Sequence, residues 1–97
     1  MATYITLMSY TDAGIKNVKE VTARLAAARE TAAGSNAAIK QFYLTLGQHD
    51  AVVVSEAPDD ITMAQLLLGV AGTGNVRTQT LRAFNRTEMA AVLAKMP

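Results

Sequence analysis

The chain has 97 residues, enough for one domain with a single core, and 51% of them are hydrophobic, so we expect some apolar surface to be buried against another chain. Nine Lys and Arg balance eight Asp and Glu without forming a basic run, which argues against a nucleic-acid partner. The absence of cysteine excludes disulfides, thiolate metal ligands and cysteine nucleophiles.

The chain opens on a predicted strand, because Thr3 to Tyr10 alternate between two unlike sets of side chains. The N-terminal residues lack a basic region followed by an apolar core, and no window approaches the ~18 apolar residues of a membrane span. We therefore expect a cytoplasmic protein with no membrane partner. Thr11 and Asp12 suit a helix N-cap, and apolar residues then recur at helical spacing up to Gly34, which predicts one helix of about twenty residues.

A hairpin follows, with strands predicted over Ile39 to Leu46 and Asp50 to Ala57 and a short Gly47-Gln48-His49 connection. Pro58-Asp59-Asp60 ends the second of these strands and caps a helix from about Ile61 to Ala71.

The segment Gly72-Thr73-Gly74-Asn75 ends that helix. It follows a helix and precedes a strand, whereas a phosphate-binding loop follows a strand and opens a helix, so a turn explains these glycines better. Val76 to Phe84 then forms a fourth strand, and Thr87 to Lys95 forms a closing helix. Residues 1–97 thus make a single domain.

The order β-α-β-β-α-β with a C-terminal helix predicts an α+β, ferredoxin-like fold, in which a four-stranded antiparallel sheet carries both long helices on one face. We expect the aliphatic residues of the strands to face the helices: Ile5, Leu7, Phe42, Leu44, Leu46 and Leu81. The mixed aromatic and polar set faces the other way: Tyr4, Thr6, Met8, Tyr10, Gln41, Tyr43, Thr45, Thr78, Thr80 and Arg82.

This second, uncovered face carries few charges, so we expect a second copy of the sheet to cover it and form a homodimer or larger assembly. A small molecule would bind in a lined barrel between the two sheets, where its contacts include Tyr4, Thr6, Tyr43 and Arg82.

Segments along nearly the whole chain resemble the GYD domain family, within the dimeric α+β barrel superfamily. They are Thr3-Tyr4-Ile5-Thr6-Leu7, Phe42-Tyr43-Leu44-Thr45-Leu46-Gly47, Glu56-Ala57-Pro58-Asp59-Asp60, Gly74-Asn75-Val76-Arg77-Thr78 and Leu81-Arg82-Ala83-Phe84. Gly47, Gln48, His49 and Asp50 occupy the place of the Gly-Tyr-Asp motif, with histidine in the place of tyrosine. The resemblance implies a dimeric α+β barrel and implies no particular activity.

The hairpin turn holds the chain's one histidine beside a carboxylate, so it is the first candidate for chemistry. The topology predicts that Tyr10, Asp12, His49, Asp50 and Arg77 converge at one end of the sheet, together with Thr11 and Asn75. His49 is then the proton donor or acceptor, with Asp50 or Asp12 orienting it and Arg77 or Arg82 holding an anion. In the alternative interpretation His49 is a solvated turn residue and Asp50 holds backbone amides.

One histidine makes a poor metal site, since zinc or iron normally takes two or three His and carboxylate ligands; we expect no metal and no cofactor. The leading interpretation is an oligomer-forming protein that binds a small molecule. The alternative is a cofactor-independent enzyme of the isomerase or oxygenase type that uses His49.

Overall fold

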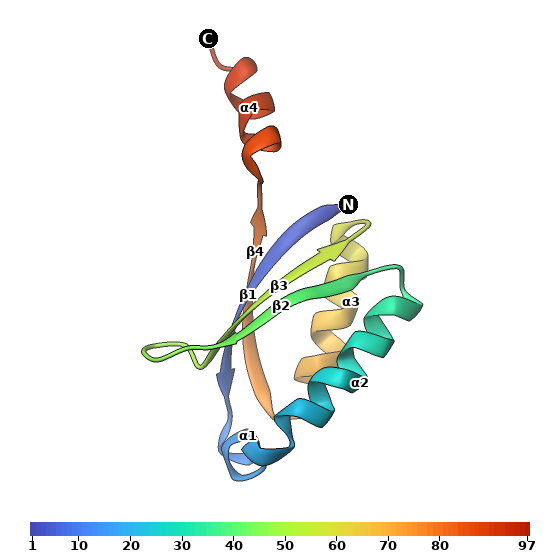
Figure 1. The fold of residues 1–97 in the computed structure, drawn as a ribbon, viewed down its shortest axis with the longest axis vertical. Helices are drawn as coiled ribbons and strands as arrows, with labels where there is room; N and C mark the ends of the chain where they lie inside the picture. Colours follow the sequence, from blue (N-terminus) through green and yellow to red (C-terminus); the bar gives the residue numbers. More distant parts are fainter.

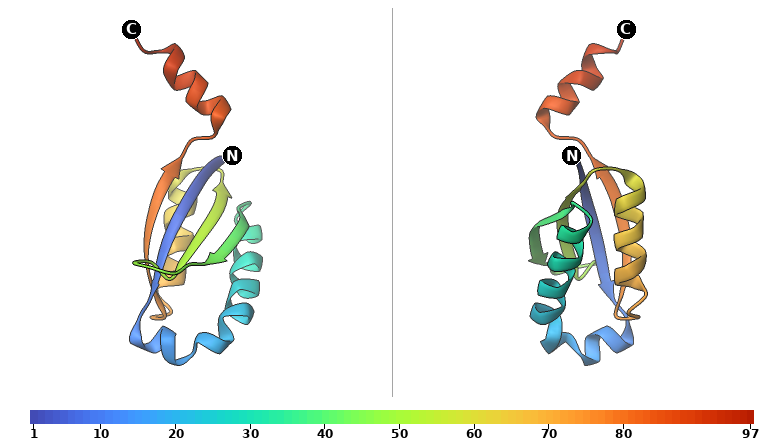
Figure 2. Two further views of the ribbon diagram at one scale, coloured as in Figure 1. Left: turned by 60° about the vertical axis from the view of Figure 1, so that its left-hand side comes forward. Right: turned by 90° about the vertical axis from the view of Figure 1, so that its right-hand side faces the viewer.

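The computed structural model describes residues 1–97, and its elements follow the predicted order. The strands are β1 (Ala2–Tyr10), β2 (Ala38–Leu44), β3 (Ala51–Ala57) and β4 (Val76–Ala83), and the helices are α1 (Asp12–Lys16), the 3₁₀ turn η1 (Val18–Glu20), α2 (Val21–Gly34), α3 (Asp60–Ala71) and α4 (Arg86–Ala94). The strands form one antiparallel sheet in the order β2-β3-β1-β4. Helices α2 and α3 lie on the same face of this sheet (Figures 1 and 2). This is the expected ferredoxin-like α+β arrangement.

None of the helices is both long and apolar enough to cross a membrane.

The first helical segment is interrupted, where the sequence predicts one long helix. Helix α1 ends at Lys16 and is capped by Asn17, whose side-chain amide donates to the Ala13 carbonyl at 3.1 Å, and α2 begins only after η1. The start of α1 is tied to the turn before β4, because the Thr11 amide donates to Asn75 O at 3.0 Å. We call this contact between Thr11 and Asn75 the anchor. The chain changes direction between the anchor and the sheet face that α2 covers (Figure 1).

Gly14 makes the anchor possible. A Cβ atom on Gly14 would lie 1.9 Å from the Asn75 carbonyl oxygen, so only glycine allows α1 to approach this turn so closely. The turn itself contains Gly74 at φ +81, and the Gly74 carbonyl accepts the Thr11 hydroxyl at 2.6 Å. Two glycines far apart in sequence thus join the ends of β1 and β4.

Strand β2 is shorter than predicted and contains a bulge. It ends at Leu44, and the following Thr45–Asp50 segment is a loop in which Leu46 is 99% exposed. The register shifts between Ile39 and Gln41, so Lys40 is the extra residue. Because of the bulge, Ile39 and Phe42 lie on the same side of the sheet although they are three residues apart.

For β1 and β4, the prediction of which side chains face the helices is wrong. Tyr4 and Thr6 are only 4% and 3% exposed, and Tyr4 packs with Met63 of α3, so the even-numbered residues of β1 face the helices. The register places Arg82, Thr80 and Thr78 opposite Tyr4, Thr6 and Met8, hence on the same face. The threonine hydroxyl groups on this face form a hydrogen bond with each other, with 2.8 Å between Thr6 Oγ1 and Thr80 Oγ1. This hydrogen bond removes most of the cost of burying them.

The face opposite the helices, which we call the open face, is therefore aliphatic. It carries Ile5 and Leu7 of β1 with their register partners Val52, Val54, Leu81 and Gln79. Gln41 and Tyr43 of β2 lie there too, as predicted, and Phe42 faces the helices, as predicted. Leu44 pairs with Ala51 on the helix side, yet it is 71% exposed because it lies at the end of the strand.

Candidate functional site

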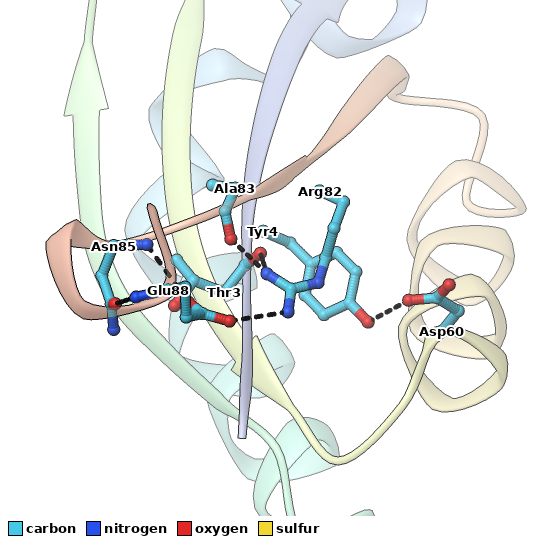
Figure 3. Close-up of polar contacts among 7 residues, drawn as sticks. All are labelled: Thr3, Tyr4, Asp60, Arg82, Ala83, Asn85 and Glu88. Carbon is cyan, nitrogen blue, oxygen red and sulfur yellow. Dashed lines mark hydrogen bonds and ion pairs between the residues drawn. The ribbon is translucent and has the colours of Figure 1, made fainter. Parts of the chain in front are cut away.

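Arg82 of β4 contacts several polar groups at the junction between the sheet and α4 (Figure 3). Its Nη2 lies 3.0 Å from Oε2 of Glu88, and its Nη1 donates to the carbonyl of Thr3 at 3.3 Å and to that of Ala83. The guanidinium therefore links two neighbouring strands to the first turn of α4. An arginine suits this task because its planar fork donates in several directions at once.

The same guanidinium lies against two aromatic rings. Its central carbon is 4.6 Å from the centre of the Phe84 ring and 5.7 Å from that of Tyr4. The Tyr4 hydroxyl reaches α3 and donates to Asp60 Oδ1. This hydrogen bond, with burial, raises the pKa of Tyr4 above its usual 10.0, although Arg82 acts in the opposite direction. The phenol is therefore a fixed hydrogen-bond donor at neutral pH.

Helix α4 starts with a capping box. The Asn85 side chain accepts from the Glu88 amide at 2.8 Å, and the Glu88 carboxylate accepts from the Asn85 amide at 3.1 Å. The Asn85 amide and the Arg82 guanidinium hold the pKa of Glu88 below its usual 4.5. Beyond this junction α4 projects away from the domain (Figures 1 and 2), with Met89, Val92 and Leu93 exposed at helical spacing and Met96 exposed just after the helix ends.

In the hairpin turn, Asp50 forms hydrogen bonds with backbone groups of β1. Asp50 Oδ2 accepts from the Tyr10 amide at 2.8 Å, and the Asp50 amide donates to the Met8 carbonyl at 2.8 Å, so the turn extends the pairing of β1 and β3. The Thr45 hydroxyl donates to the His49 carbonyl at 2.7 Å and closes the loop. His49 is half-buried, and its Nδ1 is buried with no hydrogen-bond partner in the chain.

The expected convergence at this end of the sheet is partial. Hydrogen bonds join Tyr10 to Asp50 and Thr11 to Asn75, and Tyr10 pairs with Val76. Asp12 lies exposed in the first turn of α1, with no side-chain hydrogen bond to His49 or Asp50. Arg77 pairs with Ser9 on the open face. The structure thus brings Asp50 to Tyr10, and it gives His49 no carboxylate partner.

The six predicted ligand-binding residues are distributed over three places. Thr6 and Tyr10 line a cavity between the sheet and the helices. Tyr4 and Arg82 belong to the junction in Figure 3, and Tyr43 and Arg77 lie on the open face. Within one chain they do not form a single pocket, because the two faces of a sheet point in opposite directions.

Sequence reasoning missed two features. The aliphatic open face around Leu81, which is 46% exposed, was expected to be core. The cavity between the sheet and α2 was not expected, and the alanines that run through α2 were the one available signal of it. No group of three or more His, Asp and Glu side chains comes together as metal ligands would.

Comparison with known proteins adds a family and a relative. The family model described as GYD domain matches residues 4–93. The chain is also similar to a glutamine synthetase and cystathionine beta-lyase binding protein of Thermus thermophilus. The two are 34% identical over 100 residues, which cover 96% of this chain and 99% of the relative. No solved structure matches the chain.

Proposed function

The chain belongs to the GYD domain family, and we propose that it is a small binding protein that forms a homodimer through its open face and binds partner enzymes through the parts that this dimer leaves exposed. The relative's name supports the enzyme-binding half of the proposal, since that protein is named for binding glutamine synthetase and cystathionine beta-lyase. A cytoplasmic location belongs to the same proposal.

The observation that carries the homodimer is the aliphatic open face. Ile5, Leu7, Val52, Val54 and Leu81 form a continuous apolar patch by register, and no helix covers it (Figure 2). Monomers rarely leave such a patch in water, because its burial against a like surface is favourable at about 25 cal/mol per Å². Two antiparallel sheets that meet face to face also satisfy the twofold symmetry of a dimer.

Two exposed apolar features remain for a partner enzyme. The end of β2 presents Leu44, which is 71% exposed, and the hairpin loop presents Leu46, which is 99% exposed; α4 presents a stripe that includes Leu93. A helix with apolar residues at positions i, i+3 and i+4, here Met89, Val92 and Leu93, suits a groove on another protein. The capping box and the contact of Arg82 with Glu88 fix the direction in which this helix leaves the domain.

The test combines oligomeric state with partner capture. Light scattering at micromolar concentration should give the mass of a dimer or larger assembly, and immobilised chain should retain purified glutamine synthetase or cystathionine beta-lyase of its own organism. Leu46→Asp or Leu93→Asp should reduce retention, whereas Leu68→Asp, a change at a leucine on α3 that is 75% exposed, should not. A monomer refutes the dimer, and failure of the wild-type chain to retain either enzyme refutes the enzyme-binding half.

Binding of a small molecule between the paired sheets stays a prediction. Such a molecule would meet Tyr43, Gln41 and Gln79 beside the aliphatic patch. The cofactor-independent enzyme is favoured by one observation, the unpartnered and buried Nδ1 of His49. A thermal-shift screen of metabolites would find ligands, and loss of conversion of any ligand in His49→Ala would support that second function.

A further inference from the structure

A cavity of about 580 Å³ lies between the helix-covered face of the sheet and helices α2 and α3. Its walls are mainly apolar: Leu25 and Ala28 of α2, Phe42 and Val53 of the sheet, and Leu66 and Val70 of α3. Its volume falls within the range of small-molecule sites, which is roughly 300 to 1,000 Å³. It is separate from the open face, so it goes beyond the function proposed above.

The cavity exists because α2 presents short side chains to the sheet. Ala27, Ala28 and Ala32 line it from this helix, and methyl groups do not reach the sheet. The buried core is correspondingly small, and no large side chain of the chain is completely buried. Protein interiors are normally close-packed, so an apolar space of this size offers unused contact surface to a bound molecule.

The charges around the cavity define what would occupy it. Arg24 is the one charged side chain in its lining, and no carboxylate lines it. Arg24 lies near the start of α2 with its side chain 29% exposed, and its Nη2 is 3.3 Å from Oε2 of Glu20, which is 69% exposed. A pair this open to water is weak, so an anionic ligand can replace Glu20 at little cost.

We propose that this cavity binds a monocarboxylate with a long apolar body, of the medium-chain fatty-acid type. The hydrocarbon part lies among Leu25, Phe42 and Leu66, and the carboxylate pairs with Arg24 in place of Glu20. An amine of the same length meets no carboxylate in the lining, and a second charged group on the ligand meets no partner there. The site is therefore selective for one negative charge at one end of an apolar chain.

The experiment measures binding of dodecanoate and of dodecanol to the intact protein by calorimetry, below their aggregation concentrations. Dodecanoate should bind saturably and more tightly than dodecanol. Arg24→Gln should weaken dodecanoate by about two- to fivefold, the range for a part-exposed ion pair, and leave dodecanol unchanged. Glu20→Gln should strengthen dodecanoate, because it frees Arg24. The matched control is Arg29→Gln, a change on the same helix outside the lining.

A second variant tests whether the ligand lies inside the cavity. Ala28→Phe fills the cavity and should abolish binding of both molecules, and Ala28→Leu serves the same purpose with a smaller side chain if the first variant does not fold. Unchanged binding in a folded Ala28 variant, equal affinity of dodecanoate and dodecanol, or no saturable binding would each overturn the proposal. Light scattering of the same samples reports the dimer separately, so a failure here is distinct from a failure of the proposed function.

Discussion

Leu81 offers the most direct measurement of the open face. It is 46% exposed in the single chain, so about half of its side chain remains to be buried when two copies meet. Complete burial of a leucine is worth about 1.5–3 kcal/mol, and half of it is therefore worth roughly 0.7–1.5 kcal/mol. A twofold interface contains the residue twice, so Leu81→Ala should weaken the dimer by about 1.5–3 kcal/mol, or roughly 10- to 100-fold in Kd.

Sedimentation equilibrium of wild type and Leu81→Ala over a range of concentrations gives this ratio directly. Leu68→Ala is the matched control, because Leu68 is 75% exposed on α3 and lies outside the open face. Leu81→Glu should leave only monomers, since it introduces a charge at an apolar interface. If Leu81→Ala and Leu68→Ala have the same Kd as wild type, the copies do not associate through the open face and the reasoning above is refuted.

Three further results are expected. Gly14→Ala should cost about 1–3 kcal/mol of stability in thermal melts, because its Cβ would overlap the Asn75 carbonyl. The interactions that hold the pKa of Glu88 below its usual 4.5 stabilise the fold above that value, and this stabilisation is lost as the pH falls through the folded pKa. The protection factors of the α4 amides, in which the exchange rate is corrected for its intrinsic pH dependence, should therefore fall in acid, and Glu88→Gln should remove that fall. The interactions that raise the pKa of Tyr4 stabilise the fold below the unfolded value of about 10, and this stabilisation is lost as the pH rises through the folded pKa. Tyr4→Phe should therefore make the free energy of unfolding depend less on pH in the alkaline range.

The order of elements follows from local signals that survive in the structure. Asp59 caps α3 as its position after Pro58 predicts, and its side chain accepts from the Thr62 amide at 2.8 Å. The turn at Gly74 and Asn75 separates α3 from β4 where the glycines predict it. These signals act within a few residues, so tertiary contacts do not override them. The order then leaves few topologies, and the ferredoxin-like sheet is one of them.

The orientation of the sheet was predicted wrongly for β1 and β4, and the reason is physical. Alternation divides a strand into two sets of side chains, and it does not say which set faces the helices. Hydrophobicity alone places Ile5 inside and Thr6 outside. The structure reverses this, since Thr6 is paired with Thr80 and Tyr4 with Asp60 across elements distant in sequence. Such pairs become visible only when the register is known.

The candidate site was less predictable than the fold. The sequence places Asp50 beside His49, but adjacent residues at a strand end point in different directions, and Asp50 instead binds the Tyr10 amide. The alternative in which Asp50 holds backbone amides describes this contact. The junction around Arg82 depends on the direction of α4, which the Asn85 cap sets after β4 has ended. The cavity depends on the distance between α2 and the sheet, and no local pattern encodes that distance.

The two proposed binding surfaces are opposite sides of the same strands. In β1, Leu7 lies on the open face, whereas Thr6 and Met8 line the cavity. In β3, Val52 and Val54 lie on the open face, whereas Val53 lines the cavity. We predict that a ligand in the cavity restricts the backbone that also carries the dimer surface, so that the sheet loses less entropy when a second copy binds. The same linkage requires the dimer to bind the ligand more tightly than the monomer does by the same factor, because coupling between two binding equilibria is reciprocal.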